Sequence, residues 1–376
     1  MKIDTLHFKN DTWLIDTKEP CNPDTVDIVF VFGDIIQLKE YDNARLLKQK
    51  YPNAHIVGAS TAGNILDDEL SEYSAVAAAV SFDKGHVLVK QTSITDKESL
   101  YDTSAILAQS FPKDKLKHLF VLADGLKING SELVRALNDN LDVSVTGGLA
   151  GDAFDFADHT LVFADAPAQE KAVVAVGFYG DSIHTNIGCK AGWQEFGAER
   201  IVTRAEGNII YEIDNKPALD LYEAYLGEYI KDLPASGLLF PLNIREYEGD
   251  HEVIRVMMGI NEDKSLIFAG DIPQGSTVRL MKTNIDNLID GASLVANAIQ
   301  KHNNKPALAL TVSCSGRRSV LKQLVDEELD AIHRSLNEHT QIVGFYSYGE
   351  IAPFSDDVLD CKLHNQTITL TVVYED

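Results

Sequence analysis

Several features that identify common protein classes are scarce or missing in this sequence of 376 residues. No apolar run approaches the roughly 20 residues needed to cross a bilayer. The N-terminus MKIDTLHFKNDTW has charges where a signal peptide needs an apolar stretch. The four cysteines contain no CxxC pair, which argues against a disulfide framework and a structural zinc site: Cys21, Cys189, Cys314 and Cys361. We therefore expect a cytoplasmic protein.

Basic residues are also scarce, with 33 Lys and Arg against 57 Asp and Glu, and the net charge is −24. Binding to nucleic acid or to an anionic membrane surface depends on Lys and Arg, so neither partner is expected. There is no HExxH, P-loop or GxGxxG motif, which leaves metalloprotease, NTPase and dinucleotide-binding functions without support. The length favours two domains.

A ten-residue pattern occurs three times: IVGASTAGNI at 56–65, SVTGGLAGDA at 144–153 and IVGFYSYGEI at 342–351. Each copy starts like the end of a strand and continues into a loop with glycine and a polar side chain. Glycine lets backbone approach a neighbour or a ligand closely, because it has no Cβ. Such repeats indicate a repeated architecture.

Each copy belongs to a unit of strand, turn, helix, strand, loop and strand, which predicts an α/β fold of mixed sheets with helices. In each unit we expect the first two strands to be parallel. The predicted first strands and helices are 27–32 and 37–51, 118–123 and 131–140, and 307–313 and 320–336. The first 25 residues show no clear pattern and are expected to be a lead-in.

Residues between the second and third units do not repeat this order of predicted elements. A hairpin is expected over 200–214, and the other predicted elements are a helix over 218–226, strands over 238–242, 253–258 and 266–269, and a helix over 284–301. We place the domain boundary near Gly197, which gives an N-terminal domain, 1–197, and a C-terminal domain, 198–376.

The three loops are expected to gather at one edge of the sheets, where open α/β sheets usually bind ligands. Their polar groups are those of Asn64, Asp152 and Glu350, with the hydroxyls of Ser60 and Thr61. The glycines expected to give backbone access are Gly148 and Gly151. The alternative is that these loops are tight packing turns whose polar groups pair locally.

The turn Cys314–Arg318 precedes the third helix, and a helix N-terminus attracts anions. Arg317 there is a candidate to bind a carboxylate, and Cys314 is a candidate contact. Carboxylates on one side and an arginine on the other suit a zwitterion such as an amino acid. Tyr346 and Tyr348 alternate along a strand and share one side of the sheet, while Phe345 is expected in the core.

An enzyme is the weaker interpretation. A hydrolase or transferase would use Cys314 or Ser315 as nucleophile and His364 as base, but SCSGR lacks the G-x-S-x-G pattern. We therefore expect a binding protein, not an enzyme.

Seven segments together resemble the FIST family: GGLAGD, GCKAGWQEFG, IVTRAEGNIIYEIDNKPA, YLG, SCSGRR, GFYSYGEI and LHNQT. The resemblance covers the chain from about Val26 onward and implies tandem FIST N and FIST C domains. It implies a stand-alone sensory protein that binds a small ligand, with amino acids proposed as ligands. The implied partner is a separate histidine kinase, chemoreceptor or cyclic-di-GMP enzyme. The family often has a proline where this chain has Glu195-Phe196.

Some stand-alone proteins of this kind bind haem and sense nitric oxide, regulating a histidine kinase. The resemblance therefore leaves haem open as a cofactor, which would need an axial ligand. The candidates are His364 in LHNQT, and His184 and Cys189 beside the GCKAGW segment.

Overall fold

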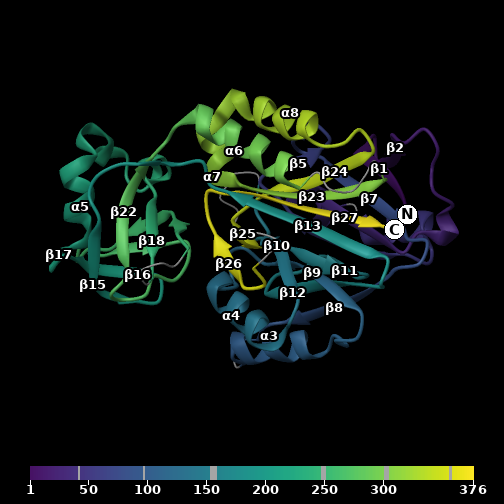
Figure 1. Cartoon of the computed structure of the whole chain (residues 1–376), viewed down its shortest axis with the longest axis horizontal. Coiled ribbons are helices and arrows are strands. Elements are labelled where there is room, and N and C mark those ends of the chain that lie inside the picture. The colour runs from purple at the N-terminus through teal and green to yellow at the C-terminus, as the bar shows by residue number, and fades with distance from the viewer. Residues whose placement is uncertain (41–42, 96–97, 153–158, 247–250, 300–304, 355–357) are drawn as a thin grey trace.

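The computed structural model describes residues 1–376 except 41–42, 96–97, 153–158, 247–250, 300–304 and 355–357. Three six-stranded sheets form a body, and a nine-stranded sheet forms a lobe at one end of it (Figure 1). The chain leaves the body for this inserted lobe, residues 194–282, and then returns. Among the helices in the described ranges, none is long and apolar enough to span a membrane.

The first sheet holds the first unit, in the order β11-β4-β3-β7-β1-β2. Strand β3 is buried at every position, as its continuous apolar run predicts. It runs parallel to β4 and antiparallel to β7. The helix predicted over 37–51 is helical on both sides of residues 41–42, which lie outside the described residues. The elements are β1 (Lys2–Lys9), β2 (Thr12–Ile15), η1 (Pro23–Thr25), β3 (Ile28–Gly33), α1 (Ile35–Glu40), α2 (Asn43–Lys50), β4 (His55–Ser60) and β7 (Ala75–Ser81).

The prediction of an unpatterned lead-in is wrong, because β1 and β2 lie within it and extend the first sheet. Polar residues inside β1 hide its pattern. Asp4 is fully buried, and its carboxylate accepts hydrogen bonds from the Cys21 N–H at 2.9 Å and the Tyr51 hydroxyl at 3.3 Å. These distant partners make a buried carboxylate tolerable in the strand.

The second sheet has the order β26-β25-β10-β9-β12-β8. Strand β9 is parallel to β10 and antiparallel to β12, as in the first unit. Helix α4 begins after Asn129, whose side chain accepts from the N–H groups of Ser131 and Glu132. The elements are β8 (His86–Ser93), α3 (Leu100–Gln109), β9 (Leu116–Ala123), α4 (Gly130–Asn140), β10 (Ser144–Leu149) and β12 (Ala172–Tyr179).

The third sheet has the order β13-β27-β23-β24-β5-β6, with β23 parallel to β24 and antiparallel to β27. The helix predicted over 320–336 is divided, because Lys322 has a positive φ of 53°. The elements are β13 (Ile183–Lys190), α6 (Ile285–Ala298), β23 (Ala307–Cys314), α7 (Ser315–Leu321), η4 (Lys322–Leu324), α8 (Val325–Ser335), β24 (Thr340–Ser347) and β27 (Ile368–Glu375).

Each unit sends a short strand into another unit's sheet. Strand β5 pairs with β24, β25 pairs with β10, and β11 pairs with β4, so the exchange runs in a closed cycle. As a result, the second and third sheets contain strands from both sides of the predicted boundary at 197/198. The exchanged strands and their hairpin partners are β5 (Asn64–Leu66), β6 (Glu69–Ser71), β11 (Val162–Ala164), β25 (Gly349–Pro353) and β26 (Cys361–His364).

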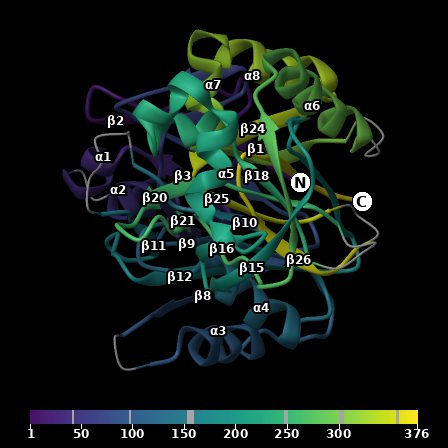
Figure 2. The same ribbon diagram turned by 90° about the vertical axis from the view of Figure 1, so that its left-hand side faces the viewer.

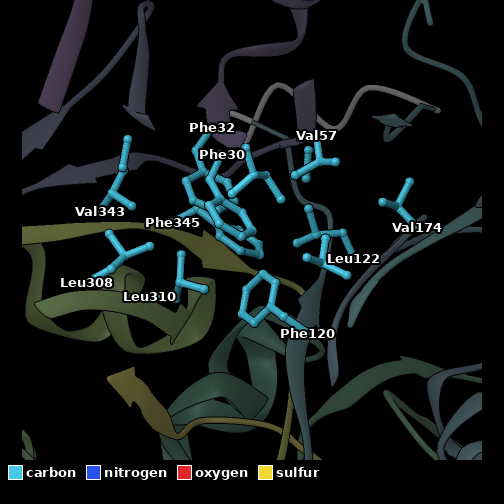
Figure 3. Close-up of a cluster of buried hydrophobic side chains, with 14 of the residues drawn as sticks. Phe30, Phe32, Val57, Phe120, Leu122, Val174, Leu308, Leu310, Val343 and Phe345 are labelled. Carbon is cyan, nitrogen blue, oxygen red and sulfur yellow. The ribbon is translucent and has the colours of Figure 1, made fainter. Parts of the chain in front are cut away.

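The inner faces of the three sheets share one core (Figure 3). Phe30 of the first sheet packs edge-on against Phe120 of the second, with ring centroids 5.8 Å apart. Phe32 stacks on Phe345 of the third sheet at 4.7 Å, which confirms Phe345 as a core residue. Helices cover the outer faces, with α3 and α4 on one side of the body and α6 and α8 on the other (Figure 2). The predicted α/β fold of repeated units is therefore confirmed.

The inserted lobe contains the predicted hairpin but not the strand predicted over 238–242. A 3-10 helix follows Pro234, and the strand starts only at Leu242, where it pairs with β22. The elements are β14 (Gln194–Glu195), β15 (Arg200–Glu206), β16 (Ile209–Ile213), β17 (Lys216–Pro217), α5 (Ala218–Tyr225), η2 (Gly227–Asp232), η3 (Ala235–Leu239), β18 (Leu242–Arg245), β19 (Val253–Arg255), β20 (Met257–Ile260), β21 (Leu266–Phe268) and β22 (Thr277–Lys282).

The lobe is hydrogen-bonded to the body. Arg255 is 5% exposed and donates through Nη1 to the Leu363 carbonyl at 2.8 Å. Asp271 accepts from Asn129 Nδ2 at 3.1 Å, and its N–H donates to Ser131 Oγ at 3.1 Å. These contacts attach the lobe to β26 and to the start of α4.

Candidate functional site

The three repeated loops meet, as their common pattern predicts. The Gly151 N–H donates to the Ser60 carbonyl at 2.9 Å, which joins the second loop to the first. The Ala62 N–H donates to the Tyr346 carbonyl at 2.9 Å, joining the first loop to the third. The Tyr348 N–H donates to the Leu149 carbonyl at 3.1 Å, closing the ring of contacts.

Glycine is needed in these loops because other protein atoms fill the space beside it. A Cβ on Gly148 would lie 2.7 Å from Val312 Cγ1, and one on Gly151 would lie 2.9 Å from the Ala62 nitrogen. Both distances are shorter than ordinary van der Waals contact. The glycines thus allow the loops to pack against one another.

Polar groups of the first loop also bond to the protein. Ser60 Oγ donates to the Gly151 carbonyl at 2.8 Å, and Thr61 Oγ1 donates to Asn64 Oδ1 at 2.6 Å. Asn64 Nδ2 donates to the carbonyls of Ser71 and Ser74. This local pairing matches the alternative in which the loop is a packing turn.

The third loop repeats this pairing with an acid. Ser347 Oγ donates to Glu350 Oε1 at 2.6 Å, in the same positions of the repeat as Thr61 and Asn64. Glu350 Oε2 accepts from the Thr367 N–H at 3.1 Å and its hydroxyl at 2.9 Å.

The Glu350 carboxyl is completely buried. Burial raises its pKa from 4.5 to about 7, while the hydrogen bonds from Ser347 and Thr367 and the charge of Arg317 lower it. Burial is the largest of these effects. This carboxyl therefore changes its protonation near neutral pH.

Two buried carbonyl oxygens follow β26, next to Thr367 in the chain. Asn365 Oδ1 and Gln366 Oε1 belong to side chains that are 1% and 0% exposed, and neither has a hydrogen-bond partner among the described residues. Gln366 Nε2 donates to the Leu238 carbonyl of the inserted lobe at 3.2 Å. We call the following buried group the polar edge cluster: Cys314, Ser347, Glu350, Asn365, Gln366 and Thr367.

Sequence reasoning missed four members of the polar edge cluster. Ser347 could have been found by aligning it with Thr61 in the repeat. Asn365, Gln366 and Thr367 form a polar run between two strands, and Gln366 has a positive φ of 60°. Only the tertiary structure buries this turn beneath the lobe.

Cys314 is 4% exposed, and burial together with the nearby Glu350 raises the pKa of its thiol. A nucleophilic thiol needs a lowered pKa, so the shift is opposite to that of a catalytic cysteine. Ser315 is the first residue of α7. His364 Nε2 lies 3.0 Å from the Ala352 carbonyl, and burial lowers its pKa to about 4.

Arg317 forms a fully buried ion pair with Glu328 of α8. Its guanidinium makes four hydrogen bonds, two to Glu328 and one each to the carbonyls of Ala191 and Leu288. The Tyr346 hydroxyl also donates to Glu328, at 3.0 Å. Sequence reasoning missed Glu328, an acid on the apolar face of its helix. The pair connects α7 to α8 and to the ends of β13 and α6.

Asp152 is 1% exposed and lies at the end of the second loop. It is hydrogen-bonded to Tyr348 of the third loop. Burial raises the pKa of the Tyr348 hydroxyl, and the hydrogen bond and charge of Asp152 raise it further. Tyr348 and Tyr346 thus have different acidic partners.

The three candidate haem ligands have different surroundings. His184 pairs with Asp376 at 2.7 Å and stacks on Tyr374, whereas His364 is buried beside the Ala352 carbonyl. Desolvation raises the pKa of Cys189 to about 12. None of these residues lines either of two surface cavities of about 730 and 290 Å³. Among the described residues, no group of three or more His, Cys, Asp or Glu side chains is arranged to hold a metal ion. Protein groups thus already engage one ring nitrogen of His184 and one of His364.

The fold and the polar edge cluster define an α/β protein of three interlocked units with an inserted lobe. The FIST N domain model matches residues 27–216, and the FIST C domain model matches 218–353. The chain therefore belongs to the FIST family, whose domains are sensory domains that bind small ligands. The chain is also similar to an uncharacterized protein, MJ1623, of Methanocaldococcus jannaschii. They are 24% identical over 367 residues, which cover 88% of this chain and 69% of that protein.

Proposed function

We propose that this protein is a cytoplasmic sensor that binds a small polar molecule with an ammonium group, such as an amino acid. The ligand binds at the polar edge cluster and changes the action of the protein on a separate signalling partner. The observation that carries the proposal is a buried turn with unsatisfied acceptors: the buried Glu350 carboxyl bonds to Thr367, and the two residues before Thr367, Asn365 and Gln366, have buried side-chain oxygens that lack partners among the described residues.

An ammonium group matches these oxygens chemically. It has three N–H donors and no acceptor, while carboxylate and amide oxygens only accept. A buried acceptor without a partner costs roughly 1–3 kcal/mol, so a ligand that satisfies Asn365 and Gln366 recovers that energy. The positive charge also favours the ionised form of Glu350, whose burial otherwise opposes ionisation.

The predicted ligand-binding residues form two groups, according to whether their polar or backbone groups already bond to other parts of the protein. Glu350, Cys314, Asp152 and Tyr348 remain proposed contacts, because they lie at the ends of the strands and loops that meet there. Residues whose polar or backbone groups bond to other parts of the protein are proposed to hold the loops in place: Ser60, Thr61, Asn64, Gly148, Gly151, Arg317 and Tyr346. Arg317 is among these because Glu328 already neutralises its charge.

Entry of a ligand requires the lobe to move, since every member of the cluster is buried. The contacts that must open are those between Gln366 and the Leu238 carbonyl and between Arg255 and the Leu363 carbonyl. We propose that this movement is the signal to the partner. The partner classes we propose are a histidine kinase, a chemoreceptor or a cyclic-di-GMP enzyme, in keeping with the sensory role of the family.

A thermal-shift screen of the common amino acids and small amines tests the proposal. We expect at least one compound to raise Tm, and Glu350→Gln to weaken its binding about 10-fold or more by calorimetry, because a charge-assisted hydrogen bond contributes roughly 1.5–3 kcal/mol. Glu262→Gln, an exposed change of the same type in the lobe, should bind normally. A screen without any stabilising compound, or unchanged affinity in Glu350→Gln, contradicts the proposal.

A further inference from the structure

A cavity of about 730 Å³ is lined by residues of the first and third sheets and by none of the polar edge cluster. It is bordered by the β1–β2 hairpin on one side and the β5–β6 hairpin on the other. None of the predicted ligand-binding residues lines it. We call it the hairpin groove. The β1–β2 hairpin is at the end of the body opposite the inserted lobe (Figure 1).

The hairpin groove is strongly acidic. Its lining includes five carboxylates but only one lysine, and its histidine is paired with one of these carboxylates at 2.7 Å: Asp11, Asp16, Asp67, Asp68, Glu69, Lys9 and His7. Burial raises the pKa of Asp67, the Ile342 N–H opposes this, and the charges of Asp68 and Asp16 raise it further. The excess of five carboxylates over one lysine in the lining favours a cationic occupant.

Two edge strands adjoin the groove, because its residues Asp11 and Asp16 flank β2 and its residue Glu69 belongs to β6. Strand β2 is the last strand of the first sheet, and β6 is the last strand of the third, within the described part of the chain. An edge strand can accept a further strand through its main-chain groups. Leu14 of β2 lies opposite His7 of the groove in the β1–β2 register and is 41% exposed, so solvent reaches β2 beside the acidic lining. A strand added to β2 would carry every second side chain on this face.

We propose that the hairpin groove binds an extended, lysine- or arginine-rich segment of a partner protein, which pairs with β2. Its basic side chains share one face of the added strand and contact the groove carboxylates. Charge complementarity selects this occupant, because an acidic lining repels nucleic acid and acidic peptides. Binding at the hairpin groove depends on the proposed function in one respect, which is that the signalling partner is a protein.

Fluorescence anisotropy with a labelled octapeptide of alternating lysine and valine tests this inference. We expect the peptide to bind at low salt, and an octapeptide of alternating glutamate and valine not to bind. The double variant Asp11→Asn with Asp68→Asn should bind about 5-fold more weakly, since each exposed ion pair contributes up to about 1 kcal/mol. The double variant Glu228→Gln with Asp232→Asn removes the same charge from the lobe and should bind normally.

Main-chain pairing is tested by two further peptides, N-methylated either at every lysine or at every valine. Alternate N–H groups of a strand point to opposite edges, so one peptide should lose binding and the other should keep it. If the two methylated peptides bind equally, the segment does not pair with β2. The same conclusion holds if spermine displaces the lysine–valine peptide completely and methylation has no effect on binding. If the lobe variant weakens peptide binding as much as the groove variant does, the groove is not the binding site. Amino-acid binding at the polar edge cluster is measured separately, so failure here leaves that proposal standing.

Discussion

Replacing Glu350 with glutamine removes a titratable proton from the polar edge cluster while keeping the shape of the side chain. The carboxyl is completely buried and accepts hydrogen bonds from Ser347 and Thr367. The neighbouring thiols of Cys314 and Cys189 stay neutral between pH 4.5 and 8, because burial raises their pKa values. If the free energy of unfolding depends on pH differently in Glu350→Gln and in wild type, the difference therefore arises from this carboxyl.

The sign follows from the raised pKa. The folded protein binds the proton of Glu350 more tightly than the unfolded chain, whose carboxyl has the ordinary value of 4.5 against about 7 in the folded state. The stabilisation from this proton is complete below pH 4.5 and is lost as the pH rises to about 7. At 1.36 kcal/mol for each pKa unit, the loss is about 3 kcal/mol.

Urea unfolding at intervals between pH 4.5 and 8 measures this loss. The free energy of unfolding of Glu350→Gln minus that of wild type should rise by about 3 kcal/mol across the range and then level off. The exposed control, Glu262→Gln, should give a curve parallel to wild type. Parallel curves for Glu350→Gln would refute the reasoning, since they would mean that the carboxyl has the same pKa in the folded and unfolded chains.

Three further changes test other parts of the structure. Arg317→Ala should lower the free energy of unfolding by about 3–5 kcal/mol in urea, because it leaves Glu328 charged and buried, and a loss below 1 kcal/mol would contradict this. Gly344→Ala places a Cβ against the Thr311 backbone oxygen and should lower the free energy of unfolding by on the order of 3 kcal/mol. Gly259→Ala, whose Cβ would lie 3.5 Å or more from its neighbours, should change it by under about 1 kcal/mol. Alkylation by iodoacetamide, followed by mass spectrometry, should modify Cys314 only on unfolding, and preferential labelling of the native thiol would support a nucleophilic role instead.

The repeated units were predictable because each depends on local pattern. Strand β3 is apolar throughout and becomes buried throughout, and α4 starts at Gly130, one residue before its expected start. The first strand was missed because Asp4 interrupts its apolar pattern, and the partners of Asp4 are 17 and 47 residues away in the chain. A polar residue that is buried against partners far away in the chain adds nothing to the hydrophobic periodicity of the local sequence.

The site was partly predictable. The repeat places Asn64 and Glu350 in equivalent positions, and the structure gives each a hydroxyl partner three residues earlier. The two side chains nevertheless have different surroundings. Asn64 bonds to main-chain carbonyls, whereas Glu350 is an acid buried near Arg317. Arg317 was predicted to bind a ligand carboxylate, and its ion pair with Glu328 appears only when two helices pack together.

The sequence by itself determined the family, the three α/β units and the meeting of their loops, because apolar runs, helical spacing and glycine act over a few residues. The tertiary structure decided which strands are exchanged, since β5 pairs with a strand about 280 residues further along the chain. It also decided that the lobe covers Gln366 and that Glu350 is buried. Burial depends on everything that surrounds a side chain, and so the pKa of Glu350 follows from the assembled fold.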